Sequence, residues 1–279
     1  MSQENLMTPI VRTALFVPGS RPERFAKALA CGADAVIIDL EDAVEASLKA
    51  QARDNLAAFL CAEPTARVRV RVNAAGDPEQ AADLELCGRL PGVVGILLPK
   101  AERAAQVRVA VACGKPVWPL VESARGLLAL GEIAACEGVE RLTFGGLDLA
   151  LDIGMSNGTP AAATVYDQVR LSLLLHSRVN GLQPPLDTVY PAFDDAEGLA
   201  ATIRHGRDQG LVGGAVHPSE AGCGGPCGAG ARRRRTGLGP ARGGGRAEWR
   251  GCVPGRWTDG RRPCAGPCPA PAGQRRPLT

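Results

Sequence analysis

A repeated alternation of two kinds of segment constrains the fold of this chain more than any other feature. Between residues 12 and 219, short apolar runs alternate with longer segments that are rich in alanine. Such an alternation indicates parallel βαβ units, and eight apolar runs favour a (β/α)8 TIM barrel over an open sheet. The predicted strands are Ala14–Val17, Ala35–Leu40, Val68–Val72, Gly95–Leu98, Val117–Val121, Leu142–Phe144, Leu186–Tyr190 and Gly214–Val216.

The segments between these runs carry apolar residues at a spacing of three to four, which predicts amphipathic helices. We expect helices at Pro22–Leu29, Leu48–Leu60, Ala81–Leu90, Ala101–Cys113, Ala124–Cys136, Tyr166–Asn180 and Ala196–Gln209. The predicted barrel domain therefore covers residues 1–220. In such a barrel the functional side chains lie at the carboxyl ends of the strands, on the loops that lead into the helices.

The composition changes abruptly after residue 220. Residues 221–279 hold 15 Gly, 12 Arg, 8 Pro and 5 Cys, but no Ile, Phe or Lys. Their 12 basic and 2 acidic residues give a net charge of +10, whereas residues 1–220 carry a net charge of −7. Such a segment cannot bury enough apolar surface to offset the entropy of ordering it. We predict an irregular, disordered tail, or the product of a frameshift in a GC-rich gene near residue 220.

Two other interpretations of the tail stay open. The pairs Cys223/Cys227 and Cys264/Cys268 have a spacing that zinc sites tolerate. The arginine run 232–235 could bind phosphates of a nucleic acid, but only two tryptophans accompany it, which argues against nucleic-acid binding. Elsewhere no apolar run approaches the roughly 18 residues of a membrane span, and the first residues lack a signal pattern. A cytoplasmic protein without a membrane segment is the default expectation.

Two acidic residues follow two of the predicted strands. Glu122 closes the run that starts at Val117, and Asp148 follows the run that starts at Leu142. Carboxylates at the mouth of a parallel barrel are well placed to hold a hard metal ion, although a role in capping the next helix is the simpler alternative. Arg71 ends an earlier strand, and a permanently charged, forked guanidinium suits a carboxylate.

Further polar residues follow neighbouring strands. Asp39, Glu41 and Asp42 come after the second predicted strand, and Lys100 comes after the fourth. A rim that mixes several acids with Arg71 and a lysine suits a divalent cation and an anionic substrate together.

Several strings at these positions resemble the citrate lyase beta subunit family, within the HpcH/HpaI aldolase group of phosphoenolpyruvate/pyruvate barrels. The resemblance extends from about residue 12 to residue 219. It rests on residues 12–19 (RTALFVPG), 32–44 (GADAVIIDLEDAV), 70–73 (VRVN), 98–100 (LPK), 122–126 (ESARG) and 144–149 (FGGLDL). It implies a (β/α)8 barrel that assembles into homo-oligomers, as trimers or hexamers.

The resemblance also implies a Mg²⁺-dependent lyase that cleaves a carbon–carbon bond in a 3-hydroxyacyl-CoA such as citryl-CoA. The products would be acetyl-CoA and a 2-oxo acid such as oxaloacetate. Glu122 and Asp148 are then the metal ligands, and Arg71 holds the substrate carboxylate or an oxyanion, with Lys100 lining the site. The phosphates of CoA would meet Arg12 and the turn at residues 18–21.

The proton carrier is harder to assign. Related pyruvate aldolases place a histidine where this chain has Asp42, and a carboxylate can serve as a base if its neighbours raise its pKa. Asp39 and Glu41 are those neighbours, and either could instead anchor water.

Three other functions stay open. The chain could be a malyl-CoA or citramalyl-CoA lyase, a CoA-independent pyruvate aldolase, or a catalytically idle barrel that binds acids.

Overall fold

The computed structural model describes residues 11–190 and 195–216. Its strands form one parallel sheet in the order β7-β6-β5-β4-β3-β2-β1-β8. The strands are β1 Thr13–Pro18, β2 Ala35–Asp39, β3 Val68–Arg71, β4 Val93–Leu98, β5 Val117–Val121, β6 Arg141–Phe144, β7 Gln183–Leu186 and β8 Gly214–Val216.

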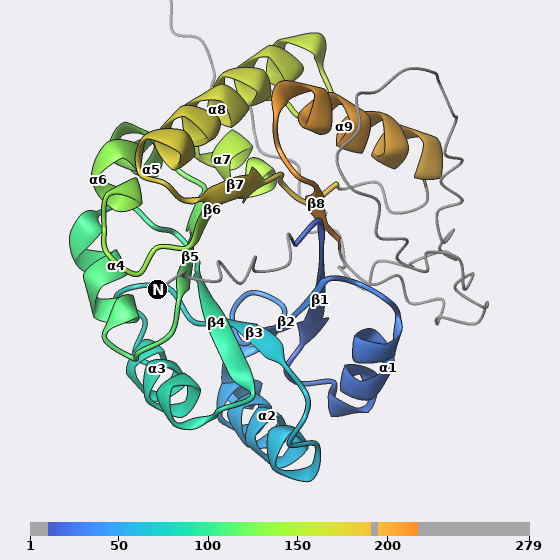
Figure 1. Ribbon diagram of the computed structural model, residues 1–279, viewed down its shortest axis with the longest axis vertical. Helices are drawn as coiled ribbons and strands as arrows, with labels where there is room; N and C mark the ends of the chain where they lie inside the picture. Colours follow the sequence, from blue (N-terminus) through green and yellow to red (C-terminus); the bar gives the residue numbers. More distant parts are fainter. Residues whose placement is uncertain (1–10, 191–194, 217–279) are drawn as a thin grey trace, which may run out of the picture.

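Helices surround the sheet on its outer side (Figure 1). They are α1 Phe25–Ala30, α2 Lys49–Ala62, α3 Gln80–Arg89, α4 Ala104–Val111, α5 Ala124–Leu128, α6 Leu130–Ala134, α7 Gly146–Asp152, α8 Pro160–Val179 and α9 Ala196–Gln209, with short 3-10 turns at Pro22–Arg24 and Ala46–Leu48. This arrangement of a parallel sheet with helices on one side confirms the predicted α/β class.

The two edges of the sheet meet at the residue that follows β7. Asp187 forms an isolated parallel bridge with Gly214, and its N–H donates to the carbonyl of Gly213 over 2.8 Å. The sheet therefore curls into the barrel-like ring of strands seen in Figure 1. All strands point the same way, so their carboxyl ends share one rim.

Alternate residues of each strand face two different cores. One set packs outward against the helices and includes Ile38, Val70 and Ile96, each fully buried. The other set faces the inside of the ring, where Phe16 and Trp118 belong to a smaller apolar cluster. This alternation follows from the period of two along a strand, and it explains why a polar residue on an inner position is carried into the ring.

Side-chain caps mark the start of several helices, and a glycine marks the end of one. The side chains of Ser123, Thr159 and Asp195 accept a backbone N–H in the first turn of α5, α8 and α9 respectively. Helix α9 ends at Gly210 with a left-handed φ of 112°, a conformation that glycine adopts without steric cost.

The main differences from the predicted elements concern β7, the helix predicted at Ala124–Cys136 and one further helix. Strand β7 lies at Gln183–Leu186 rather than Leu186–Tyr190, although it contains two prolines. Its pairing with β6 has a shifted register, and an irregular ladder tolerates residues without an N–H. The helix predicted at Ala124–Cys136 is broken into α5 and α6 at Ala129, whose φ and ψ are −92° and 5°. Helix α7 was not predicted, because it follows β6 after only Gly145.

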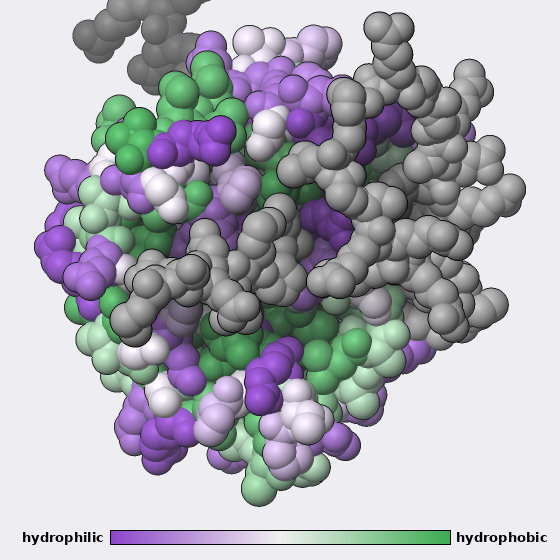
Figure 2. All heavy atoms as spheres, viewed as in Figure 1, coloured by the Kyte–Doolittle hydropathy of each residue, from purple (hydrophilic) through white to green (hydrophobic). Residues whose placement is uncertain are grey.

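Hydrophilic side chains cover much of the visible outer edge of the molecule, interspersed with hydrophobic ones (Figure 2). Within residues 11–190 and 195–216, no helix has both the length and the apolar character needed to cross a membrane. The predictions of a disordered or frameshifted tail, a tail zinc site and a phosphate-binding arginine run concern residues 221–279, which lie outside the described residues.

Candidate active site

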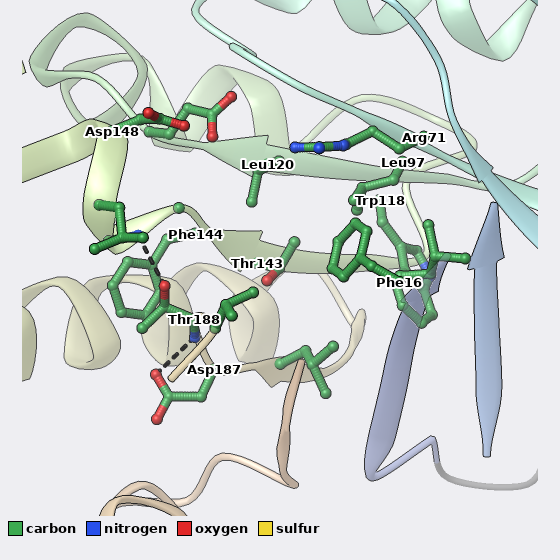
Figure 3. A pocket seen from close by; sticks show the side chains of 17 residues that line it. Phe16, Arg71, Leu97, Trp118, Leu120, Thr143, Phe144, Asp148, Asp187 and Thr188 are labelled. Carbon is green, nitrogen blue, oxygen red and sulfur yellow. Dashed lines mark hydrogen bonds between the residues drawn. The ribbon is translucent and has the colours of Figure 1, made fainter. Parts of the chain in front are cut away.

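All the predicted site residues except Arg12 gather at the carboxyl ends of β2 to β6. Asp39 and Arg71 are the last residues of β2 and β3, Glu122 directly follows β5, and Asp148 lies in the first turn of α7. In Figure 3, Arg71 extends across the upper part of a pocket toward Asp148. The pocket is lined by Phe16, Ile37, Arg71, Leu97, Trp118, Leu120, Glu122, residues 143–148 and residues 186–189.

Asp39 and Arg71 form a forked ion pair because the strand register places them side by side. They are direct partners in the β2–β3 ladder. Nε and Nη2 of Arg71 donate to the two carboxylate oxygens of Asp39 over 2.7 and 2.5 Å. Burial opposes the ionisation of Asp39, but the charge and hydrogen bonds of Arg71 outweigh it and hold the pKa of Asp39 below its usual value. Asp39 therefore orients Arg71.

Glu41 lies between the two cations of the rim. Its Oε2 is 3.1 Å from Nη1 of Arg71, and its Oε1 accepts a hydrogen bond of 2.7 Å from Nζ of Lys100. Burial raises the pKa of Glu41, and the positive charge of Arg71 opposes the rise. Asp42 lies 3.6 Å from Nζ of Lys100, with 55% of its side chain exposed. Among the acids of this turn, Asp42 is the one open to solvent and to a substrate.

Glu122 is buried, with 4% of its surface exposed. The backbone N–H of Lys100 donates to its Oε1 over 2.7 Å. A Cβ at Gly145 would collide with the Glu122 carboxylate, so the glycine leaves the space that this carboxylate fills. Burial raises the pKa of Glu122 to about 8, the negative charges of Asp148 and Glu41 add to the rise, and the Lys100 N–H opposes it.

Glu122 and Asp148 are chemically suited to a hard divalent cation. Both line the same pocket, and a bound cation would offset the burial of Glu122 and the neighbouring charge of Asp148, which raise the pKa of Glu122. Mg²⁺ is usually held by one or two carboxylates, while water and substrate supply its other ligands. Two carboxylates suffice for such an ion, and no group of three or more His, Cys, Asp or Glu in the described residues could hold a metal.

Arg12 is the predicted site residue that the structure does not bring to the others. It precedes β1, at the amino ends of the strands, where its backbone N–H donates to Asp34 over 2.9 Å. Its guanidinium lies 3.8 Å from Asp34 and is largely exposed. The position of Arg12 at the amino ends of the strands gives no support to the predicted contact with CoA phosphates. The turn at residues 18–21, in contrast, lies at the carboxyl end of β1 and on the same rim as Glu122.

A second buried ion pair borders the pocket. Nε of Arg170, in α8, donates to both carboxylate oxygens of Asp187 over 3.0 and 3.1 Å. Nη1 of Arg170 also donates to Asp167, three residues earlier in α8, over 2.9 Å, which is a usual spacing for a pair on one face of a helix. Thr188, which the sequence did not single out, accepts the N–H of Gly146 over 2.8 Å and so ties the chain after β7 to the start of α7 (Figure 3).

A parallel α/β ring with polar residues gathered at the carboxyl ends of its strands is the architecture of a large class of enzymes. The model of the HpcH/HpaI aldolase/citrate lyase family matches residues 12–218, and the chain belongs to this family.

Two curated relatives and one solved structure illustrate the similarity. A citrate lyase subunit beta-like protein of Mycobacterium tuberculosis is 40% identical over 211 residues, which cover 74% of each chain. A (3S)-malyl-CoA thioesterase of Cereibacter sphaeroides is 38% identical over 214 residues, which cover 75% of this chain and 74% of the relative. The structure of CitE from M. tuberculosis in complex with magnesium, acetoacetate and coenzyme A superposes with a TM-score of 0.65 at 38% identity, covering 75% of this chain and 77% of CitE.

Proposed function

We propose that this chain is a Mg²⁺-dependent carbon–carbon lyase on a (β/α)8 barrel. It would cleave a 3-hydroxyacyl-CoA such as citryl-CoA to acetyl-CoA and a 2-oxo acid such as oxaloacetate. The observation that carries the proposal is the pocket in which Glu122 and Asp148 lie beside Arg71. The relatives support it, since one structure of the citrate lyase beta subunit from M. tuberculosis contains oxaloacetate and magnesium.

Glu122 and Asp148 would hold the metal. When bound, the ion would polarise the oxygen that becomes the keto group of the 2-oxo acid and offset the charge of its carboxylate. Lys100 and Gly145 fix Glu122, by a hydrogen bond and by close packing respectively. The carboxylate is therefore held in place before any ligand arrives, which is the usual support of a metal ligand.

Arg71 would bind the carboxylate of the 2-oxo acid. A guanidinium has five N–H donors, and Asp39 accepts hydrogen bonds from two of them. Other donors stay available for a substrate oxygen, while the forked pair with Asp39 fixes the direction of the group. Asp39 thus acts through Arg71 rather than on the substrate, and Lys100 adds positive charge to the same rim.

Asp42 is the candidate for the base that removes the proton of the substrate hydroxyl. Its side chain is exposed on the rim, whereas both oxygens of Asp39 accept hydrogen bonds inside the protein. A carboxylate within reach of the hydroxyl can accept this proton as the carbon–carbon bond breaks. For the thioester, we propose that the turn at residues 18–21 takes the CoA phosphates. Assembly into trimers or hexamers stays a prediction.

A second candidate is hydrolysis of the thioester, because one relative is named a malyl-CoA thioesterase. A panel of citryl-CoA, malyl-CoA, citramalyl-CoA and free 4-hydroxy-2-oxo acids, assayed with and without Mg²⁺, separates the possibilities. Release of a 2-oxo acid together with acetyl-CoA supports the lyase. Release of free CoA with the intact hydroxy acid supports the thioesterase, and cleavage of the free acids alone supports a CoA-independent aldolase. No turnover of any compound contradicts an enzymatic role and leaves the acid-binding barrel.

A further inference from the structure

Lys49, the first residue of α2, reaches back to the turn that follows β2. Its ammonium donates to the carbonyl oxygens of Leu40 and Glu41 over 2.9 and 3.1 Å and to Oδ1 of Asn73 over 2.5 Å. An ammonium has three donors, so every one of them has a protein partner. The side chain is half-buried and links the ends of β2 and β3 from outside the ring.

A lysine at this position contradicts the usual preference of a helix. The amino end of a helix carries partial positive charge and favours acidic residues, whereas Lys49 brings a cation there. The contacts of its ammonium offset this disadvantage, because two carbonyl dipoles and an amide oxygen surround the charge. The residue therefore serves the turn after β2 rather than the helix that it starts.

The third partner of Lys49 is itself held in a buried network. The backbone N–H and Nδ2 of Asn73 donate to Oδ2 of Asp83 over 2.8 and 2.6 Å, and Asp83 is fully buried. Nη1 of Arg53, one turn along α2 from Lys49, donates to the other oxygen of Asp83 over 3.0 Å. Lys49 is thus linked, through Asn73, to a buried carboxylate on α3.

Glu41 lies in the turn that Lys49 contacts, and its carboxylate contacts both cations of the rim. The Glu41 carboxylate lies 3.1 Å from Arg71 and 2.7 Å from Lys100. The N–H groups of Glu41 and Ala43 bond Asp39, the other partner of Arg71. A shift of this turn would therefore move both carboxylates that orient Arg71.

We infer that Lys49 is a positioning residue. It fixes the turn at residues 40–44 and, through Glu41, the two cations that would receive the substrate carboxylate. The effect of Lys49 on substrate binding rests on the function proposed above, whereas its effect on the turn does not. Two measurements, one for each effect, distinguish them.

Hydrogen exchange tests the hold on the turn without any ligand. The N–H groups of Leu40, Glu41, Ala43 and Val44 are all hydrogen-bonded. Lys49→Met should speed their exchange at least tenfold, and Lys49→Gln, which keeps donors without charge, should have a smaller effect. Lys27→Met, at an exposed site in α1, is the control and should change nothing here. If Lys49→Met folds and its turn exchanges at the wild-type rate, the inference is wrong. If Lys49→Met does not fold, Lys49→Gln takes its place, and an unchanged rate in that variant likewise contradicts the inference.

Calorimetric binding of oxaloacetate in the presence of Mg²⁺ tests the link to the site. We expect the dissociation constant to rise at least tenfold in Lys49→Met and less in Lys49→Gln, with Lys27→Met equal to the wild type. A purely structural lysine would lower the melting temperature and leave the affinity of the folded protein unchanged, which would refute the positioning role. Failure of the wild type to bind oxaloacetate would instead refute the proposed function, and the exchange experiment would still decide whether Lys49 fixes the turn.

Discussion

Lys100 donates its backbone N–H to Oε1 of Glu122 over 2.7 Å while its own backbone is left-handed, with a φ of 50°. It is the one non-glycine residue with a positive φ in the described part of the chain. A left-handed conformation costs an ordinary residue about 1–2 kcal/mol. Backbone strain of this kind is often found at functional sites, where the surrounding structure enforces it.

This strain can be measured by comparing two substitutions of Lys100. Both Lys100→Gly and Lys100→Ala remove the contact with Glu41, but only glycine adopts a positive φ without steric cost. We therefore expect Lys100→Gly to be more stable than Lys100→Ala by about 1 kcal/mol in urea unfolding, which reverses the order at an ordinary loop position. Equal stability of the two variants would show that the backbone at this position carries no strain.

Substitution of the two acids tests the proposed metal site. Glu122→Gln or Asp148→Asn should weaken Mg²⁺ binding at least tenfold, because each removes one of two charged ligands, while the fold is retained. Calorimetry measures the affinity, and circular dichroism checks the fold. Asp152→Asn is a matched control at the other end of α7, where the asparagine oxygen can still accept the N–H of Ala124. Unchanged affinity in both Glu122→Gln and Asp148→Asn would remove the assignment.

The Asp39–Arg71 pair predicts a specific dependence of stability on pH. Asp39→Asn removes the forked carboxylate partner of the buried Arg71 and leaves Glu41 as its nearest charge, which should lower the free energy of unfolding at pH 7 by about 3 kcal/mol. The pKa of Asp39 in the folded protein lies below its unfolded value of 3.8, so the stabilisation is present above about pH 4. It is lost as the pH falls through the folded pKa.

The difference in free energy of unfolding between the wild type and Asp39→Asn should therefore be constant near neutrality. Below pH 3.8 this difference, called the stability gap here, should decrease. Urea unfolding at pH 7, 5 and 3 measures the gap. Asp54→Asn, at an exposed position of α2, serves as the control and should show no gap at any pH. A gap that stays constant to pH 3 would show that the Asp39 carboxylate is not the source of the stabilisation.

Removal of residues 221–279 tests the domain boundary predicted from composition. A segment rich in glycine, arginine and proline should contribute little packing, so truncation after Glu220 should change the melting temperature by less than about 2 °C. Scanning calorimetry of both proteins measures this. A large loss of stability on truncation would mean that the tail packs against the barrel.

Much of the ring could be predicted because its signals are local. The runs at Val117–Val121 and Ala196–Gln209 coincide with β5 and α9, since continuous apolar residues or a helical period mark them from end to end. The rim position of Glu122 and Asp148 followed from counting strands. The pairing of Arg71 with Asp39 depends on the register between two strands, which the sequence does not specify at single-residue precision.

Other features could not be predicted, for physical reasons that differ. The prolines of β7 have a low strand propensity, and tertiary pairing at an irregular ladder overrides it. Arg12 sits one residue before β1, at the amino end of the strand, so the predicted CoA contact disagreed with the rule that functional side chains follow the strands. Lys49 contacts carbonyl oxygens of another segment, and such contacts leave no periodic pattern in the chain.

The carboxylates of the rim outnumber its cations, and this has a consequence for the order of events at the site. Asp39, Glu41, Asp42, Glu122 and Asp148 are five carboxylates, whereas Arg71 and Lys100 are, within the described residues, the two cations that form ion pairs with acids of this set. A 2-oxo acid that approaches this rim alone is repelled by the excess of carboxylates, whereas a divalent cation bound first would reduce the repulsion and offer the acid a site for coordination. Binding should therefore be ordered, with the cation first, and the apparent affinity for the acid should rise with the concentration of free Mg²⁺.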